Sequence, residues 1–326
     1  MKGILLLVIV VFGTFFAKAQ DEMIFSHYIL NPVLINPAAS GFNDQHNFYL
    51  HYKNQWSGFT GAPRTVAASY NGTLSDKLGI GGFVSNENTS YYNRFRGLLS
   101  YAFRFKINDF KGGLGLSTEF KRMTLSNDVL ASSLYKQGDN VAEQLLAGQN
   151  YFDATMGIYG VYMNKFTFSA AMPNLIQARL SQQAGSNTSS GGFRYFNVMM
   201  GYKENVNEMT IEPSILVQKM VYSPTETNDV PLRIDLNLKG SFLQDKVIGA
   251  LSYRVGAGGG LGVMVGSKFN GLTFAYSYDY GLSRFQTYST GAHEISVGFS
   301  IGRKRTTVSE VPVEQPTSFL DRPYSN

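Results

Sequence analysis

Four histidines are the side chains best suited to acid–base or nucleophilic chemistry: His27, His46, His51 and His293. There is no cysteine and no Gly-x-Ser-x-Gly motif, which excludes a thiol nucleophile and the serine elbow of α/β-hydrolases. If the chain forms a closed β-sheet, a Ser–His pair on neighbouring strands could still serve a lipase, with Ser296 as the conceivable partner of His51. We prefer the interpretation that these histidines hydrogen-bond locally.

Glu294 directly follows His293 and invites a metal site. Adjacent residues of a strand point to opposite faces, so these two side chains cannot easily share one ion. We expect instead a structural contact between His293 and Asp279 that closes the last hairpin. No metal and no cofactor are predicted, and the chain is predicted not to be an enzyme.

Trp56 is the single tryptophan of the sequence. It could mark a partner-binding hot spot in the first outer loop. It could equally belong to the aromatic belt at the membrane interface, where tryptophan is enriched. We favour the belt or a packed loop.

The first 19 residues have the features of a signal peptide. Lys2 precedes an apolar stretch over 4–16, and Ala17-Lys18-Ala19 supplies the small-x-small pattern before Gln20, where cleavage is expected. The stretch is short for a spanning helix of ~20 residues and lacks a basic stop-transfer flank. Without cysteine a lipoprotein anchor is excluded. The sequence therefore predicts export, with residues 1–19 removed.

The composition points away from nucleic acid and toward a membrane barrel. The formal net charge is +5, and part of it lies in the predicted signal peptide. Charged residues make up 16%, below the ~25% of a typical soluble domain, while aromatic residues reach 14%. After the signal, no apolar run approaches the length of a spanning helix. Barrel strands explain this pattern, because half of their residues face water.

Apolar and polar residues alternate with period two almost throughout, most clearly over 95–105 and 232–239. We therefore predict an all-β outer-membrane barrel of about 14 antiparallel strands over residues 45–302. The predicted strands lie near 45–53, 64–72, 77–85, 94–105, 110–121, 151–162, 165–172, 193–202, 208–219, 231–240, 246–255, 259–268, 271–280 and 292–302. Glu212, Lys219 and Arg254 are expected to form part of a charged lumen.

The connections between these strands differ in length between the two ends of the predicted barrel. In a bacterial barrel the termini and the short turns lie in the periplasm, and the longer loops lie outside. Six of the seven predicted outer connections are longer than every inner turn; the exception is the glycine-rich 256–258. The longest, 122–150 and 173–192, are the predicted places for partner contacts, together with the periplasmic ends.

Two flanks fall outside the predicted barrel. Residues 20–44 contain Asn31-Pro32 and Asn36-Pro37, which favour turns, with apolar residues between them. We expect this segment to pack onto the barrel as a periplasmic segment or a plug in its mouth. Residues 303–326 show little periodicity and are predicted to form a flexible periplasmic tail.

Short motifs near both ends of the mature chain carry a family likeness. Their residues include 25–28, Asn31, Pro32, Asn36, Pro37, Trp56 within 54–59, Pro63, Tyr278, Asp279, Tyr280, His293 and Glu294. Through them the chain resembles the PorP/SprF family of type IX secretion proteins of Bacteroidetes from about residue 22 to 302. The likeness is specific at both ends and loose in the middle.

The resemblance implies a role as an outer-membrane component or accessory of type IX secretion, a machinery linked to gliding motility. The implied partners are a secreted surface protein or adhesin with a C-terminal sorting domain, periplasmic or outer-membrane secretion components, and outer-membrane lipid. The alternatives are a porin or transporter for small solutes or hydrophobic substrates, and the barrel lipase.

Overall fold

The computed structural model describes residues 25–130, 138, 140–176, 178–179, 194–221, 232–243, 246–256, 259–282 and 289–302. The predicted signal peptide with its cleavage site at Ala19/Gln20 and the predicted tail 303–326 lie outside these residues. So do parts of the long connections.

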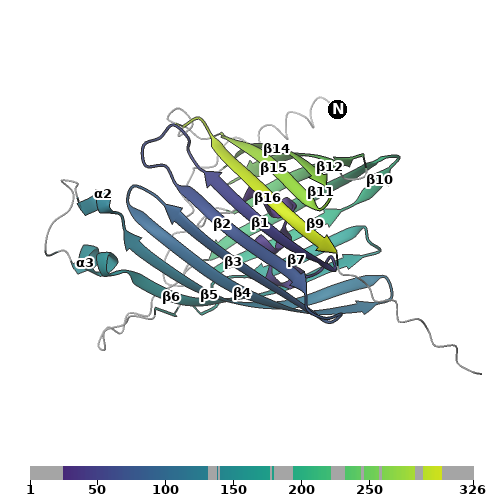
Figure 1. The fold of residues 1–326 in the computed structure, drawn as a ribbon, viewed down its shortest axis with the longest axis horizontal. Coiled ribbons are helices and arrows are strands. Elements are labelled where there is room, and N and C mark those ends of the chain that lie inside the picture. The colour runs from purple at the N-terminus through teal and green to yellow at the C-terminus, as the bar shows by residue number, and fades with distance from the viewer. Residues whose placement is uncertain are drawn as a thin grey trace, which may run out of the picture.

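The strands form one antiparallel sheet that closes on itself as a 14-stranded barrel (Figure 1). Neighbours in sequence pair with each other around the ring, β1 pairs with β16, and β9 pairs with both β7 and β11. The barrel strands are β1 (Gln45–Asn54), β2 (Arg64–Thr73), β3 (Leu78–Asn88), β4 (Tyr92–Ile107), β5 (Phe110–Leu125), β6 (Gln149–Tyr162), β7 (Phe166–Met172), β9 (Arg194–Tyr202), β11 (Met209–Val221), β12 (Arg233–Phe242), β13 (Val247–Val255), β14 (Gly260–Phe269), β15 (Leu272–Gly281) and β16 (Ala292–Gly302).

All fourteen predicted strands are present, so the predicted fold class is confirmed. Two short strands were not predicted: β8 (Ala178–Arg179) pairs with β6, and β10 (Glu204–Val206) pairs with β11. We expected a plain turn over 203–207, but the pairing of β11 continues past the end of β9 there. No helix within the described part of the chain is long and apolar enough to cross a membrane.

The two faces of the sheet differ in polarity, as a barrel in lipid requires. On β1, Phe48 and Leu50 point outward and are 49% and 64% exposed, whereas Asn47, His51 and Lys53 point into the lumen and are buried. Glu212 and Arg254 also face the lumen, as predicted. The prediction for Lys219 is wrong: buried Gln218 and Met220 occupy the luminal positions of β11, so Lys219 has the opposite parity.

The two ends of the barrel differ in their connections. At the end where β1 begins and β16 ends, the strands are joined over 74–77, 108–109, 163–165, 203–208, 243–246 and 270–271; we call this the short-turn end. The other end, here the long-loop end, carries 55–63, 89–91, 126–148, 173–193, 222–232, 256–259 and 282–291. The sorting is less complete than we predicted, because β3 and β4 pair as far as Asn88 and Asn93 and leave 89–91 short.

Two short helices lie in the connection 126–148. They are α2 (Asn127–Leu130) and α3 (Asn140–Ala147). Gly148 ends α3 with a φ of 88°, a conformation that favours glycine at a helix C-terminus.

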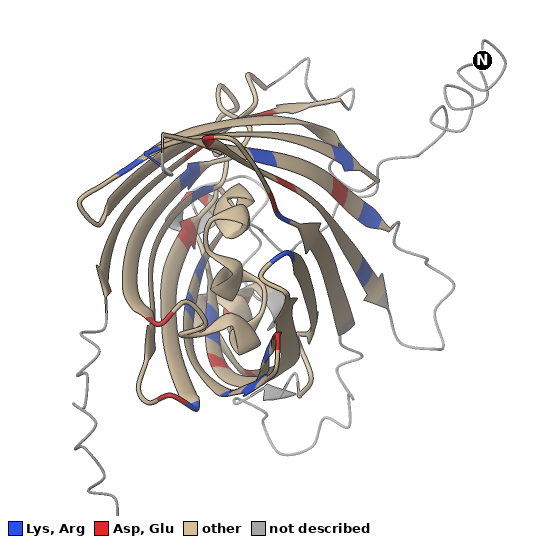
Figure 2. Cartoon of the chain, turned by 90° about the vertical axis from the view of Figure 1, so that its right-hand side faces the viewer, with Lys and Arg blue, Asp and Glu red and all other residues tan. Residues whose placement is uncertain are grey.

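Residues 25–44 lie inside the ring of strands, and we call them the plug (Figure 2). The plug consists of three 3₁₀ helices, η1 (Ser26–Ile29), η2 (Pro32–Leu34) and η3 (Pro37–Ala39). Each Asn-Pro pair starts a helix, since proline at the first helical position loses no hydrogen bond and already has a suitable φ.

The plug packs closely against the facing wall. Tyr28 and Ala38 are buried in one cluster with Tyr159, Met199 and Leu216 of the wall. Gly115 of β5 allows the plug backbone to lie directly on the sheet, and Gly157 of β6 makes room for the Asn36 side chain. A Cβ at Gly115 would collide with Pro37 and Ala38, and a Cβ at Gly157 would collide with Asn36.

The cost of a charge on the outer face should depend on its depth in the membrane. Val265 lies in the middle of β14 and Phe269 at its end, both exposed on the outer face. We expect Val265→Arg to lower the free energy of unfolding in lipid by about 2–4 kcal/mol, and Phe269→Arg by about 0–1 kcal/mol. Denaturant titration in lipid vesicles measures both, and equal costs would contradict a lipid-facing outer surface.

Candidate functional site

The most elaborate polar constellation of the described residues joins the plug to the barrel wall. Asn31 makes the first connection. Its amide donates to Ser69 Oγ on β2 at 3.1 Å, and its Oδ1 accepts from Asn71 Nδ2 at 3.2 Å. Both groups of the buried side chain are thereby satisfied, which offsets the cost of removing them from water.

Asn36 makes the second connection, on another part of the ring. Its Oδ1 accepts from the Ala38 amide at 2.9 Å and caps η3. Its Nδ2 donates to the Ile158 carbonyl at 2.8 Å on β6 and to Ser169 Oγ at 2.7 Å on β7. The two asparagines of the Asn-Pro pairs therefore act as anchors as well as turn formers.

Tyr28 makes the third connection, to β12. Asn237 Nδ2 donates to its hydroxyl at 2.8 Å, and the hydroxyl lies 3.4 Å from Asp235 Oδ2. Arg233 and Arg254 hold the buried Asp235 carboxylate, with Nε atoms 2.9 and 3.2 Å from Oδ1. The carboxylate accepts from both guanidinium groups, so the charge that faces Tyr28 is compensated.

Glu294 of β16 makes the fourth connection and receives the start of the plug. Its Oε2 accepts from the Ser26 amide at 2.8 Å, and its Oε1 accepts from the His27 amide at 3.0 Å. Lys53 Nζ lies 3.3 Å from Oε2 and supplies the counter-charge. Ser26 Oγ donates to Asp279 on β15 at 2.7 Å. Two carboxylates of the last hairpin therefore fix the first turn of the plug.

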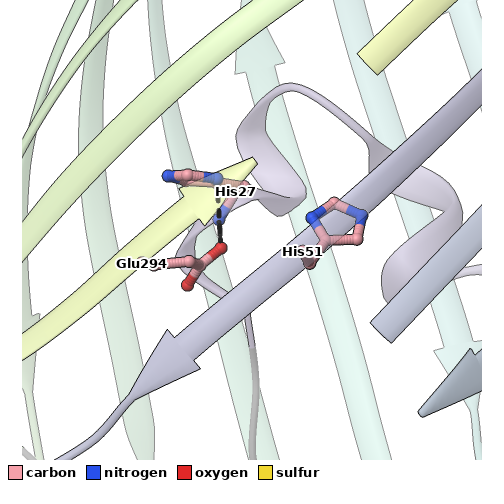
Figure 3. A group of neighbouring side chains, drawn as sticks. All are labelled: His27, His51 and Glu294. Carbon is pink, nitrogen blue, oxygen red and sulfur yellow. Dashed lines mark hydrogen bonds and ion pairs between the residues drawn. The ribbon is translucent and has the colours of Figure 1, made fainter. Parts of the chain in front are cut away.

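His27, His51 and Glu294 point toward one another at this place (Figure 3). Ser296 Oγ lies between the two rings, 2.5 Å from His27 Nδ1 and 2.6 Å from His51 Nδ1. Glu294 Oε1 is 3.3 Å from His27 Nδ1 and would repel a bare lone pair, so we assign the proton of His27 to Nδ1. Ser296 then donates to His51 Nδ1, and His51 Nε2–H donates to Ser69 Oγ at 3.2 Å.

The same three side chains form a possible metal-ligand set, with one donor atom each within 4.8 Å of one another. Apart from His27 Nε2, their donor atoms are already engaged. Both Nδ1 atoms contact Ser296, and the carboxylate accepts two amides and contacts the Lys53 ammonium, which takes the place that a cation would need. His27 Nε2 is a buried atom without a partner among the described residues. The donor set therefore fits a hydrogen-bonded cluster better than an ion site. This cluster joins the first turn of the plug to the wall, and we call it the clasp; it consists of Ser26, His27, His51, Lys53, Glu294 and Ser296.

Serine, histidine and carboxylate lie together here but not in the order of a hydrolase triad, because Ser296 and Glu294 both contact Nδ1 of His27 and the second nitrogen of His51 contacts Ser69. Ser296 is moreover 1% exposed and lies beneath the plug, where no ester can reach it. A nucleophile needs space for substrate and an oxyanion site beside it. The arrangement supports the local hydrogen bonding that we preferred for His51.

The prediction of a contact between His293 and Asp279 is wrong. Asp279 pairs with Ala292 in the sheet and faces the lumen, whereas His293 pairs with Tyr278 on the outer face. Its Nδ1 lies 2.8 Å from the Tyr276 hydroxyl, and its ring lies beside Tyr278. We placed the two residues on neighbouring strands correctly but missed the register, which puts them on opposite faces.

Four other predicted residues, Trp56, Pro63, Tyr278 and Tyr280, lie at the long-loop end or near it. Tyr278 donates to the Thr290 carbonyl, and Tyr280 is exposed on the outer face. Trp56 is 46% exposed in the connection 55–63, where the Pro63 carbonyl accepts from Gln55. His46 contacts the Tyr70 hydroxyl at 2.9 Å, apart from the clasp.

Sequence reasoning missed Lys53, placed Asp235 only among the alternating polar residues of its strand, and gave His27 no structural role. Lys53 and Asp235 are charges at alternate, luminal positions of their strands. A charge that recurs on the luminal face opposite a polar segment such as 25–28 is the signal that could have found them.

Removal of the Glu294 carboxylate should release the start of the plug. Glu294→Ala leaves two buried amides without acceptor and takes the ion pair from Lys53, a cost of at least about 1–3 kcal/mol. We expect the amides of 26–30 to exchange hydrogen about tenfold faster or more in detergent micelles.

Glu87→Ala is the matched control, because this luminal carboxylate pairs with Arg94 on the adjacent strand. The exchange of 26–30 should stay as in the wild type there. Equal protection in wild type and Glu294→Ala would show that the clasp does not hold the plug.

Solved structures similar to this one include bacterial outer-membrane proteins. The Ralstonia pickettii toluene transporter TbuX has a TM-score of 0.48 and 9% identity, and the match covers 82% of this chain and 92% of that one. The P. putida toluene transporter TodX gives 0.47 and 10%, with the same coverage of both chains. Omp33 of Acinetobacter baumannii gives 0.42 and 6%, covering 79% and 99%. These values say nothing of ligand or activity.

Comparison with curated proteins gives no match. The family model for the type IX secretion system membrane protein PorP/SprF, in contrast, matches residues 17–299. This range contains the plug with its anchors, every barrel strand up to the last residues of β16, and the clasp. The chain therefore belongs to the PorP/SprF family of type IX secretion system membrane proteins.

Proposed function

We propose that this protein is a non-enzymatic outer-membrane component of type IX secretion that assists the export or surface attachment of a secreted partner protein. A gliding adhesin with a C-terminal sorting domain is the kind of partner that we have in mind. Membership of the family supports the assignment to the secretion system. The filled lumen is the single observation that supports a docking role, in which the barrel binds other proteins at its ends and does not conduct solutes.

The plug is bonded to several sides of the ring at once. Its side chains and amides reach β2 through Asn31, β7 through Asn36, β12 through Tyr28 and β16 through the first turn. An open solute channel needs a continuous watery path through the lumen. A segment that binds strands around the ring instead supports a rigid platform whose ends meet other proteins.

Barrel orientation follows the general rule that short turns face the periplasm. In this proposal the short-turn end meets periplasmic secretion components, and the long-loop end meets the secreted protein. Long connections suit recognition, since lipid-facing surface offers little specificity. The two longest, 126–148 and 173–193, lie only partly within the described residues.

Deletion of the gene tests the secretion role. We expect the partner protein to disappear from the cell surface, as measured by surface labelling and mass spectrometry, and to return when the wild-type gene is restored. An unchanged set of surface proteins in the deletion strain, with altered solute uptake, would favour the alternative of a porin or transporter.

The filled lumen can be tested by electrical conductance in planar lipid bilayers. We expect low conductance for the wild-type protein and higher conductance for Gly115→Val, because the added side chain displaces Pro37 and Ala38 of the plug. Gly82→Val is the control, since a Cβ at Gly82 meets no atom closer than 3.8 Å. If wild-type protein and Gly115→Val conducted equally well, the plug would not close the lumen.

A further inference from the structure

A cavity of about 530 Å³ opens below the plug at the short-turn end of the lumen. Four lysines line it: Lys111 of β5, Lys203 after β9, Lys239 of β12 and Lys268 of β14. Each lies near the end of its strand that faces the short turns. Neither the clasp nor the anchors of the plug use these four side chains.

The acidic groups of the cavity are already paired. Glu212 lies 2.9 Å from Lys239 and 4.0 Å from Lys203, and Asp44 lies 2.8 Å from Arg104. Lys111 and Lys268 form no ion pair within the part of the chain that the structure describes. The cavity therefore has an excess of positive charge, and its low-dielectric walls focus that field on whatever enters.

Part of the cavity lining is apolar. Ile29, Leu30 and Phe42 of the plug form this part together with Met199 and Ile248 of the wall, and we call it the apolar floor. A bare ion would gain nothing from such a floor, while an apolar side chain would. The volume lies within the usual range for sites that take a small molecule or a few residues of peptide.

The rim of the cavity offers a free strand edge. β10 follows Lys203 directly and, among the described strands, pairs with β11 alone. Glu204 at the start of β10 is also already paired, because its carboxylate lies 2.9 Å from Lys165 Nζ. An unpaired edge of this kind can accept an extended peptide by main-chain hydrogen bonds.

We propose that this cavity binds a short acidic peptide segment of a periplasmic partner, with carboxylates at Lys111 and Lys268 and an apolar side chain on the plug. The proposal rests on the proposed function in one respect, the assignment of the short-turn end to the periplasm. The wall strands separate the cavity from the bilayer, which disfavours a lipid. The positive field of the lysines favours carboxylates, the apolar floor favours an apolar side chain, and the strand edge favours an extended main chain. Together they favour a carboxylate-bearing polypeptide.

The test uses the full chain purified in detergent and a fluorescent peptide, Gly-Asp-Leu-Glu-Gly-Asp. Anisotropy should show binding that weakens with salt, and about tenfold or more weaker binding for the Asn/Gln version of the peptide. Lys111→Gln with Lys268→Gln should weaken binding of the acidic peptide to a similar degree. Lys246→Gln, a lysine of the same end outside the cavity, should stay within about twofold of wild type.

Equal affinity for the acidic and neutral peptides would overturn the proposal, and so would an unchanged affinity of the double variant. Binding of inorganic phosphate at the same lysines without peptide binding would overturn it in favour of a small-anion site. Heat-modifiable migration on gels confirms that each variant remains a folded barrel.

The deletion strain separates the two proposals. Loss of the surface protein together with no peptide binding would reject the acidic-segment site and leave the secretion role standing. Peptide binding together with an unchanged cell surface would leave the site standing and reject the secretion role.

Discussion

The structure depends on one constraint: within lipid every backbone N–H and C=O must find its partner in the protein. A sheet meets this constraint when its first strand pairs with its last, because an open edge cannot face hydrocarbon. In this chain β1 pairs with β16 over the whole length of β1, from Gln45 opposite Gly302 to Asn54 opposite His293. Closure thus brings together residues that lie almost 250 positions apart, among them His51 and Ser296. The clasp is a direct consequence of the ring.

Closure also creates the space that the plug fills. Side chains alone fill the interior of a barrel of about eight strands, and a wider ring leaves a lumen. With 14 strands the inner wall here would enclose water unless something else occupied it. The plug occupies this space with mostly small or hydrogen-bonded residues. The wall has glycines, such as Gly115 and Gly157, where the plug lies directly against it. Buried asparagines and carboxylates then specify its position, since a half-satisfied polar network would be costly.

The strands could be predicted from the sequence because the two-residue period is a local property that lipid and water impose on every strand. The neighbourhood of His51 and Ser296 followed once the ring was assumed to close. Register could not be predicted: a shift of one residue exchanges the faces, which is why the expected contact of His293 with Asp279 failed. The position of His27 was also beyond reach, since the path of the plug depends on tertiary contacts with β2, β7, β12 and β16. Nothing in the local sequence 25–28 indicates that Glu294 accepts hydrogen bonds from the amides of this segment.

The distribution of charge separates two regions of the lumen with different roles. Around the clasp and Tyr28, each described carboxylate faces a cation or a donor: Glu294 has Lys53, and Asp235 has two arginines. Such pairing gives a rigid interior that has no further need of a ligand. At the short-turn end the balance is not kept, because Lys111 and Lys268 line the cavity and form no ion pair within the described residues. This excess of positive charge beside the apolar floor is the reason for proposing that the short-turn end, and not the clasp, binds another molecule.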